Sequence, residues 1–463
     1  MKGNFFWVYL TTLFCAIVFF LFLSFSYLRK PMMSEGNTYS RLQTTIMEIN
    51  SPNRQTDYSW LPFYDKIMTI PLKIYFDPTA FSARVFTMLI TMLTAVLVYR
   101  LTYLLTKMVT LSLAGASFYL INPLTISLST LTLSESIWTF FMLGGVVFLL
   151  GNNKKYWFLG MIFWIVSQGI RYESWYLTPV LMFVVWMRHK NIKLLFWVFI
   201  SSLLFPFYWM FESYKHTGAY LNILNIKKYY ALSGPTDIYG NLWSSVEVWW
   251  ERVLQVFTIP IIVLFLSGLY KQVKLRIWLW LIPVTIVIML ILQVFLGTME
   301  YFPARYLVAL PILVYPLVMV TINKSIIQNR LFEICIIVLL FIMETANISK
   351  KLMLISEQPI WSAVDTGHYI SKNIVNEPFV YINEKISDTT WTYSQVWYFS
   401  QVPISKFYYG WDEKYTKESN NWDNLNIILE KGDDELVDDT YINLVEKRKV
   451  IYQNKNFIIF DRL

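Results

Sequence analysis

The chain has few charged residues for its length. Only 15% of its 463 residues are Asp, Glu, Lys or Arg, whereas 56% are hydrophobic. A soluble globular protein of this size needs more polar side chains to cover its surface. The composition therefore excludes a soluble globule and predicts a polytopic membrane protein.

Cysteine and histidine are scarce as well. The two cysteines, Cys15 and Cys335, both lie within long apolar stretches, so the chain has neither a disulfide framework nor a cysteine metal site. The three histidines, His189, His216 and His368, form no paired metal-binding motif. We expect all five side chains to be ordinary core or surface residues.

Nucleotide-binding motifs are absent from the sequence. It contains neither a Walker-type loop nor a Gly-x-Gly-x-x-Gly turn. The net charge of +8 is spread over short loops, which argues against nucleic acid as a partner. A membrane enzyme without a nucleotide site must take its activated group from a molecule already in the membrane, and a lipid-phosphate sugar donor meets this requirement.

Long apolar stretches dominate what the chain does contain. A helix that crosses about 30 Å of hydrocarbon needs roughly 17–25 apolar residues. We predict about eleven spans, the first of them an uncleaved anchor. They cover residues 5–28, 82–105, 108–130, 135–150, 156–170, 172–187, 192–211, 253–270, 276–296, 305–322 and 331–347.

Five short loops carry basic residues and no acidic ones. They hold Arg100 and Lys107; Lys154 and Lys155; Arg188, Lys190 and Lys193; Lys271, Lys274 and Arg276; and Lys324 and Arg330. Lys and Arg concentrate in cytoplasmic loops, so we expect these loops to face the cytoplasm. The loop 29–80 and the region after the last span are then extracytoplasmic.

The first outer loop, residues 29–80, contains two expected helices. After Ser34, the residues Tyr39, Leu42, Ile46 and Ile49 form an apolar stripe at helical spacing, which suits a helix lying on the membrane surface. A second interfacial helix is expected from Trp60 to Tyr75.

The composition becomes that of a soluble protein near residue 349. Short strand-like runs alternate there with two expected helices, 360–374 and 391–400. The runs are Phe379–Ile382, Asn426–Leu429, Val450–Tyr452 and Phe457–Phe460. We therefore predict an extracytoplasmic α/β domain over residues 349–463, after a transmembrane domain over residues 1–348.

Five charged residues lie at the outer ends of the expected spans: Glu35, Glu135, Arg171, Glu173 and Arg305. A charge near hydrocarbon costs about 2.5–3.5 kcal/mol on insertion scales, so such residues usually face a partner or a cavity. Their shared depth favours one outward-facing site. The alternative for Arg171 and Glu173 is a pair of interface residues that extend towards the headgroups.

Six motifs in chain order resemble those of one enzyme family. They are SEGNTYSRL (34–42), WLPFY (60–64), SARVF (82–86), NPLTISLSTLTLSES (122–136), GIRYESWYLTP (169–179) and ARYLVALP (304–311). The order resembles the GT-C superfamily of integral membrane glycosyltransferases, over about residues 1–320. The similarity is greatest to the branch with the polyprenyl-phosphate-mannose-dependent protein mannosyltransferases and the lipid A aminoarabinose transferase.

The resemblance implies an inverting transfer of a sugar, mannose or another hexose, from a polyprenyl-phosphate donor to an acceptor hydroxyl. Glu35 would be the general base, and Arg171 and Arg305 would bind the departing lipid phosphate. The residues that orient donor or acceptor would be Glu135, Glu173, Trp60, Tyr64 and Arg41. The acceptor class, whether glycan, lipid or protein, stays open.

The sequence identifies no cofactor. A divalent metal stays an open alternative, because the oligosaccharyltransferase branch of the superfamily uses one that is held by several carboxylates. We do not find the full carboxylate set of that branch in this chain.

Three other functions compete with this interpretation. A transporter or flippase of lipid-linked sugars generally needs symmetry-related halves and helices broken near the midplane. An oligosaccharide polymerase or ligase should place its large outer loop late in the chain, whereas here the first loop is large. A noncatalytic surface scaffold would leave the buried charges unexplained.

The base assignment gives a first prediction. Glu35→Gln removes the proton acceptor and keeps the size of the side chain, so sugar transfer should be abolished while the protein still inserts and folds. The measurement is product formation from a polyprenyl-phosphate sugar donor, with insertion checked by gel filtration. Retained transfer would remove Glu35 from the role of base.

Overall fold

The protein is described by a computed structural model in which two compact units can be distinguished. The described residues are 2–29, 32, 36–50, 60–75, 80–222, 241–274, 277–296, 304–325, 330–346, 348–355, 360–374, 377–383, 392–403, 406–409, 424–430 and 448–462. The helical unit comprises residues 1–31, 56–67 and 83–356, and the mixed unit comprises residues 32–55, 68–82 and 357–463. Each unit is described by itself.

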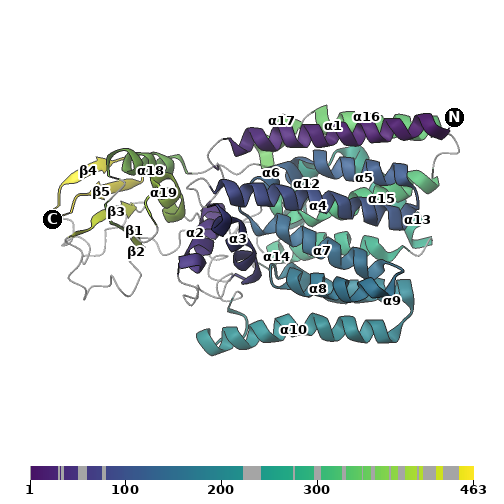
Figure 1. Ribbon diagram of the computed structural model, residues 1–463, viewed down its shortest axis with the longest axis horizontal. Coiled ribbons are helices and arrows are strands. Elements are labelled where there is room, and N and C mark those ends of the chain that lie inside the picture. Colours follow the sequence, from purple (N-terminus) through teal and green to yellow (C-terminus); the bar gives the residue numbers. More distant parts are fainter. Residues whose placement is uncertain are drawn as a thin grey trace. The chain divides into compact units, whose positions relative to one another are not determined.

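The long helices of the helical unit run side by side (Figure 1). Its elements begin with α1 (Lys2–Leu28), α4 (Phe81–Thr106), α5 (Val109–Ile121), α6 (Pro123–Ser129), α7 (Ser134–Leu150), η1 (Lys154–Tyr156), α8 (Trp157–Gln168), α9 (Glu173–His189) and α10 (Ile192–Thr217). They continue with α12 (Leu242–Val256), α13 (Ile259–Lys274), η2 (Trp278–Trp280), α14 (Leu281–Phe295), η3 (Ala304–Leu307), α15 (Ala309–Ser325), α16 (Arg330–Ala346) and α17 (Ile348–Ile355). One boundary between the units falls within α3 (Phe63–Ile74), and another falls after the second residue of α4.

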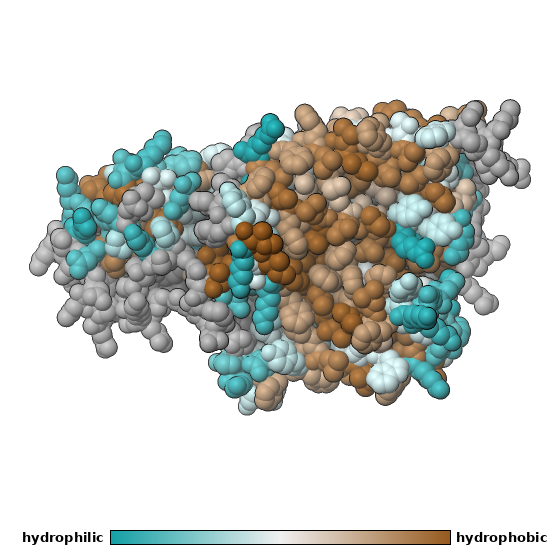
Figure 2. Space-filling model, in the orientation of Figure 1, coloured by the Kyte–Doolittle hydropathy of each residue, from teal (hydrophilic) through white to brown (hydrophobic). Residues whose placement is uncertain are grey.

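Apolar side chains cover the outside of this unit. Figure 2 shows hydrophobic residues over the visible face of the helices, and Phe14, Phe22 and Phe211 are each more than 60% exposed. Such a surface suits contact with lipid rather than water. The protein is an integral membrane protein.

The expected number of spans is not confirmed. Among the described residues, four helices are long and apolar enough to cross a membrane, or up to six if two bent pairs each count as one span. Several expected spans form shorter helices. One is α8, whose 12 residues rise only about 18 Å.

In the part of the chain that the structure describes, two apolar stretches are broken by bends. The first bend, of 61°, separates α5 from α6 at Asn122-Pro123, within the predicted span 108–130. The second, of 111°, separates α12 from α13. The predicted span 253–270 is therefore wrong at its start. Phe257 adopts an extended backbone, and Pro260 is tolerated only in the first turn of α13.

The mixed unit contains a five-stranded sheet with the order β2-β1-β3-β5-β4. The strands are β1 (Phe379–Asn383), β2 (Phe407–Tyr409), β3 (Asn426–Glu430), β4 (Val450–Gln453) and β5 (Phe457–Phe460). β1 pairs in parallel with β2 and with β3, whereas β5 pairs antiparallel with β3 and with β4. The helices α18 (Trp361–Asn373) and α19 (Thr392–Ser400) lie where helices are predicted.

The first helix of the outer loop is α2 (Gly36–Asn50). It forms as predicted, but its apolar stripe packs against α19 and not on a membrane surface. The ring of Tyr39 lies 4.8 Å from that of Tyr398, and Ser394 donates a hydrogen bond to Gln43. The same spacing suits either surface, so the sequence does not distinguish a membrane-facing stripe from a buried one.

Candidate active site

Four charged residues from separate segments meet in the helical unit. Glu135 lies in the first turn of α7 and Glu173 is the first residue of α9. Arg171 lies in the link between α8 and α9, and Arg305 lies in η3. We call these four residues the ionic cluster. Each lies near a helix start or in a link between helices.

The carboxylate of Glu135 is shared by both arginines. Its Oε1 lies 2.6 Å from Nη1 of Arg171 and 3.6 Å from Nε of Arg305. Its Oε2 accepts a hydrogen bond of 3.3 Å from the hydroxyl of Ser134. Glu135 is only 2% exposed, so these contacts must offset the loss of water around its charge.

All three guanidinium nitrogens of Arg171 make polar contacts. Nε donates to Oε1 of Glu173 at 3.0 Å, Nη2 donates to the same oxygen, and Nη1 also contacts Ser134 at 3.3 Å. Burial alone would lower the pKa of Arg171, but the neighbouring carboxylates of Glu135 and Glu173 outweigh it and raise the pKa above its ordinary value. Arg171 is therefore a fixed cation.

Two aromatic rings face the arginines. The Cζ atoms of Arg171 and Arg305 both lie 5.6 Å from the ring centre of Tyr306, and Arg171 lies 5.6 Å from a ring of Trp138. The indole of Trp138 donates a hydrogen bond of 2.8 Å to Ser174, which fixes the ring. Cation–π contacts of this kind stabilise desolvated guanidinium groups.

The sequence reasoning missed both rings, although a signal was present. Trp138 follows Glu135 at a spacing of three residues, which places both side chains on one face of α7. Tyr306 directly follows Arg305.

The segment WLPFY packs on the link that carries Arg171. The amide of Phe63 donates a hydrogen bond of 3.0 Å to the carbonyl oxygen of Gly169. A Cβ atom added to Gly169 would overlap the ring of Phe63, so glycine is required for this close approach. Tyr64 is buried and Trp60 is half-buried.

For two other predicted site residues, Glu35 and Arg41, the structure gives no position relative to the ionic cluster. Glu35 lies outside the described residues. Arg41 is half-buried on α2, in the mixed unit. Their roles stay predictions.

Arg84 binds the backbone segment that precedes Glu135. It is 1% exposed, and it donates hydrogen bonds to the carbonyl oxygens of Thr130 at 2.9 Å and Tyr27 at 2.7 Å. Thr130 ends α6 and lies just before α7. Arg84, which belongs to the SARVF motif, therefore fixes the chain that leads to Glu135.

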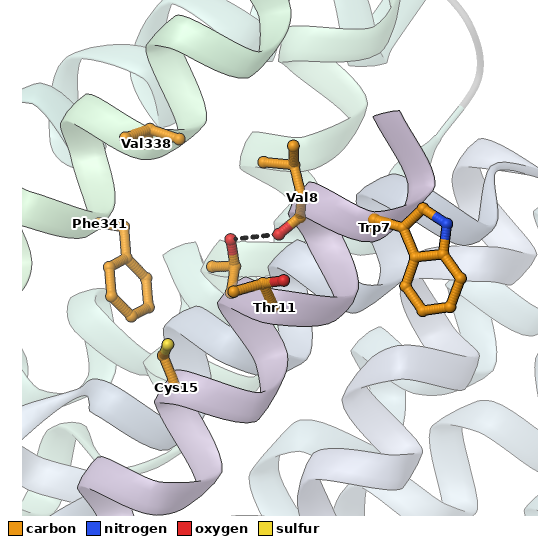
Figure 3. A pocket seen from close by; sticks show the side chains of 7 residues that line it. Trp7, Val8, Thr11, Cys15, Val338 and Phe341 are labelled. Carbon is orange, nitrogen blue, oxygen red and sulfur yellow. Dashed lines mark hydrogen bonds between the residues drawn. The ribbon is translucent and has the colours of Figure 1, made fainter. Parts of the chain in front are cut away.

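An apolar groove of about 360 Å³ opens between α1 and α16, and its lining residues carry no charge (Figure 3). The side chains of Cys15 and Phe341 extend into the space between the two helices, and the hydroxyl of Thr12 is satisfied by the carbonyl oxygen of Val8. The groove suits hydrocarbon and not polar chemistry. Among the described residues, no group of three or more His, Cys, Asp and Glu could hold a metal ion.

Comparison with known proteins gives a match in structure and none in sequence. No protein-family model matches the chain, and no curated protein matches it at a significant level. ArnT from Cupriavidus metallidurans, in the apo state, superimposes with a TM-score of 0.63 over 96% of this chain and 97% of that chain, at 11% identity. The same protein bound to undecaprenyl phosphate gives a TM-score of 0.62, at 10% identity and the same coverage.

A second similar structure is the oligosaccharyltransferase AglB from Archaeoglobus fulgidus, in complex with an inhibitory peptide and a dolichol-phosphate. It gives a TM-score of 0.52 over 91% of this chain and 69% of that chain, at 10% identity. ArnT and AglB are both GT-C glycosyltransferases. The chain therefore has the GT-C fold, as the motif order led us to expect.

Removing the fixed cation should strongly destabilise the helical unit. Arg171→Met removes the cation that pairs with the buried Glu135 and with the partly exposed Glu173, which should lower the free energy of unfolding by about 3–5 kcal/mol. Arg171→Met combined with Glu173→Gln should recover most of that loss, because Glu135 still faces Arg305. The measurement is unfolding by SDS in mixed micelles.

The matched control for this test is Arg188→Met, at the far end of α9, where Arg188 is exposed. We expect it to change the stability by less than about 0.5 kcal/mol. An Arg171→Met protein as stable as the wild type would contradict the proposed ion pairing.

Proposed function

We propose that this membrane protein is a glycosyltransferase that moves a sugar from a polyprenyl-phosphate donor to an acceptor hydroxyl, with inversion at the sugar carbon. The sugar is mannose or another hexose. The observation that carries the proposal is the buried Glu135 carboxylate shared by two arginines, within a GT-C fold. Guanidinium groups at that point suit a phosphate that must be bound and then released.

Arg305 is the better candidate for the phosphate ligand. All three guanidinium nitrogens of Arg171 contact Glu135, Glu173 or Ser134. The contact between Arg305 and Glu135, at 3.6 Å, is longer than the 2.6 Å contact between Arg171 and Glu135. A phosphate would compete with Glu135 for Arg305. Arg171 would then hold Glu135 in place, and Tyr306 would keep both guanidinium groups aligned.

In the proposed reaction, bond formation and bond breaking both occur at the anomeric carbon of the transferred sugar, on its opposite faces. The acceptor oxygen attacks the anomeric carbon, its proton passes to Glu35, and the bond from that carbon to the phosphate oxygen breaks. The negative charge of the departing lipid phosphate then develops beside Arg305, and a fixed cation in a dry site stabilises developing charge strongly. Glu173 would orient Arg171, and Trp60, Tyr64 and Arg41 would contact donor or acceptor.

The known structures support a lipid-phosphate donor. ArnT has been solved with undecaprenyl phosphate, and AglB with a dolichol-phosphate. Because both share the fold of this chain, a lipid phosphate is the donor class that we test first. The acceptor class stays open, whether glycan, lipid or protein.

The positions of the basic loop residues indicate which side of the membrane the site faces. The basic loop residues Lys154 and Lys190 follow the far ends of α7 and α9, whereas Glu135 and Glu173 lie at their starts. If these loops face the cytoplasm, the ionic cluster faces the outer side of the cell membrane. We propose that transfer occurs there, on components of the cell envelope.

Binding of undecaprenyl phosphate to the purified protein in nanodiscs tests the proposal. The wild type should bind it, and Arg305→Met should bind it about 10- to 100-fold more weakly, because one hydrogen-bonded charge contact is lost. Arg188→Met, at the other end of the helices, should bind like the wild type.

Turnover is checked with polyprenyl-phosphate-mannose and polyprenyl-phosphate-glucose, by following donor hydrolysis or transfer. Equal affinities of the wild type and Arg305→Met would remove Arg305 from the site. Absence of binding to the wild type would contradict a lipid-phosphate donor.

A further inference from the structure

The two helix breaks of the helical unit meet at the side chain of Asn122. Its Nδ2 donates hydrogen bonds of 2.9 Å to the carbonyl oxygen of Val256 and 2.9 Å to the hydroxyl of Tyr315. Its Oδ1 accepts from the amides of Leu124 and Thr125, at the start of α6. A side-chain amide has two donor and two acceptor positions, and here all four are used.

The second break is held by a buried carboxylate. Glu344 has no exposed surface, and its Oε1 accepts hydrogen bonds from the amide of Thr258 at 3.1 Å and from its hydroxyl at 2.8 Å. Its Oε2 lies 3.6 Å from Nζ of Lys351 on α17. Glu344 thus satisfies the start of α13 and fixes the chain two residues beyond Val256, the residue that Asn122 contacts.

Asn122 is connected to the segments that carry Glu135 and Arg305. On one side it caps α6, where the carbonyl oxygen of Leu128 accepts a hydrogen bond of 3.1 Å from Ser136, the neighbour of Glu135. On the other side it binds Tyr315 on α15, the helix that follows η3 and Arg305 directly. One amide therefore joins the supports of Glu135 and Arg305.

We propose that Asn122 and Tyr315 are positioning residues for the lipid phosphate. Their hydrogen bond fixes α15 against α6. It thereby sets the distance between Glu135 and Arg305, and at that distance Arg305 can exchange its contact with Glu135 for one with the phosphate. This inference rests on the proposed function, because it takes Arg305 as the phosphate ligand. It concerns residues that touch neither donor nor acceptor.

Tyr315→Phe is the sharpest variant for this inference. It removes only the hydroxyl oxygen, and the ring stays packed between Phe118 and Phe257, whose ring centres each lie 5.6 Å away. The matched control is Tyr9→Phe, which removes a hydroxyl that is bonded to Glu333 at 2.8 Å in a buried contact between α1 and α16.

The experiment measures undecaprenyl phosphate affinity for the wild type, Tyr315→Phe, Arg305→Met, the double variant and Tyr9→Phe. Tyr315→Phe should weaken binding about threefold to tenfold. In the Arg305→Met background it should cause no further loss, because its effect acts through Arg305. Tyr9→Phe should bind like the wild type.

Two results would overturn this inference without contradicting the proposed function. Tyr315→Phe could bind like the wild type, or it could weaken binding by the same factor whether or not Arg305 is present, as a general loosening of the helices would. A wild-type protein that does not bind undecaprenyl phosphate is a different result, since it would contradict the proposed function itself.

Discussion

The pairing of one buried carboxylate with two guanidinium groups is the constraint on which the candidate site depends. Glu135 is almost fully buried, and its Oε1 contacts both Arg171 and Arg305. Each of these charges would be costly if it were alone in a low-dielectric interior, and each removes part of the cost of the others. The start of α7, the link between α8 and α9, and η3 must therefore lie together, although the chain brings them from widely separated positions.

Much of this arrangement could be predicted from the sequence, because the energetic argument needs only the position of a charge along an apolar stretch. Glu135, Arg171, Glu173 and Arg305 all lie at the ends of expected spans, and the structure brings them together. The partners within the cluster could not be predicted, since the commitment of Arg171 to Glu173 depends on side-chain geometry. The bend between α12 and α13 was also missed, because a hydropathy average over residues 253–270 hides a break at Phe257. The stripe of α2 was assigned to the wrong surface for a related reason, since a membrane and a protein core are equally apolar.

The helix breaks and the ionic cluster use polar groups in opposite ways. At the breaks, Asn122 and Glu344 bind backbone groups of the same chain, and the hydrogen-bonding capacity of Asn122 is fully used within the protein. A transporter that bound its substrate at broken helices would need such groups for the substrate. Here Asn122 makes its four hydrogen bonds within the protein, so it leaves none for a substrate. The chain thus shares the fold of ArnT at 11% identity, and a few polar side chains hold its bent helices in place.

The most direct test of this account is an experimental structure, by electron cryo-microscopy in nanodiscs, of the protein with undecaprenyl phosphate. The account predicts that the phosphate contacts the guanidinium of Arg305, that Arg171 still holds Glu135, and that the contact between Glu135 and Arg305 is lengthened or lost. A phosphate bound away from Arg305, with the four charges of the ionic cluster paired as they are without it, would contradict the account.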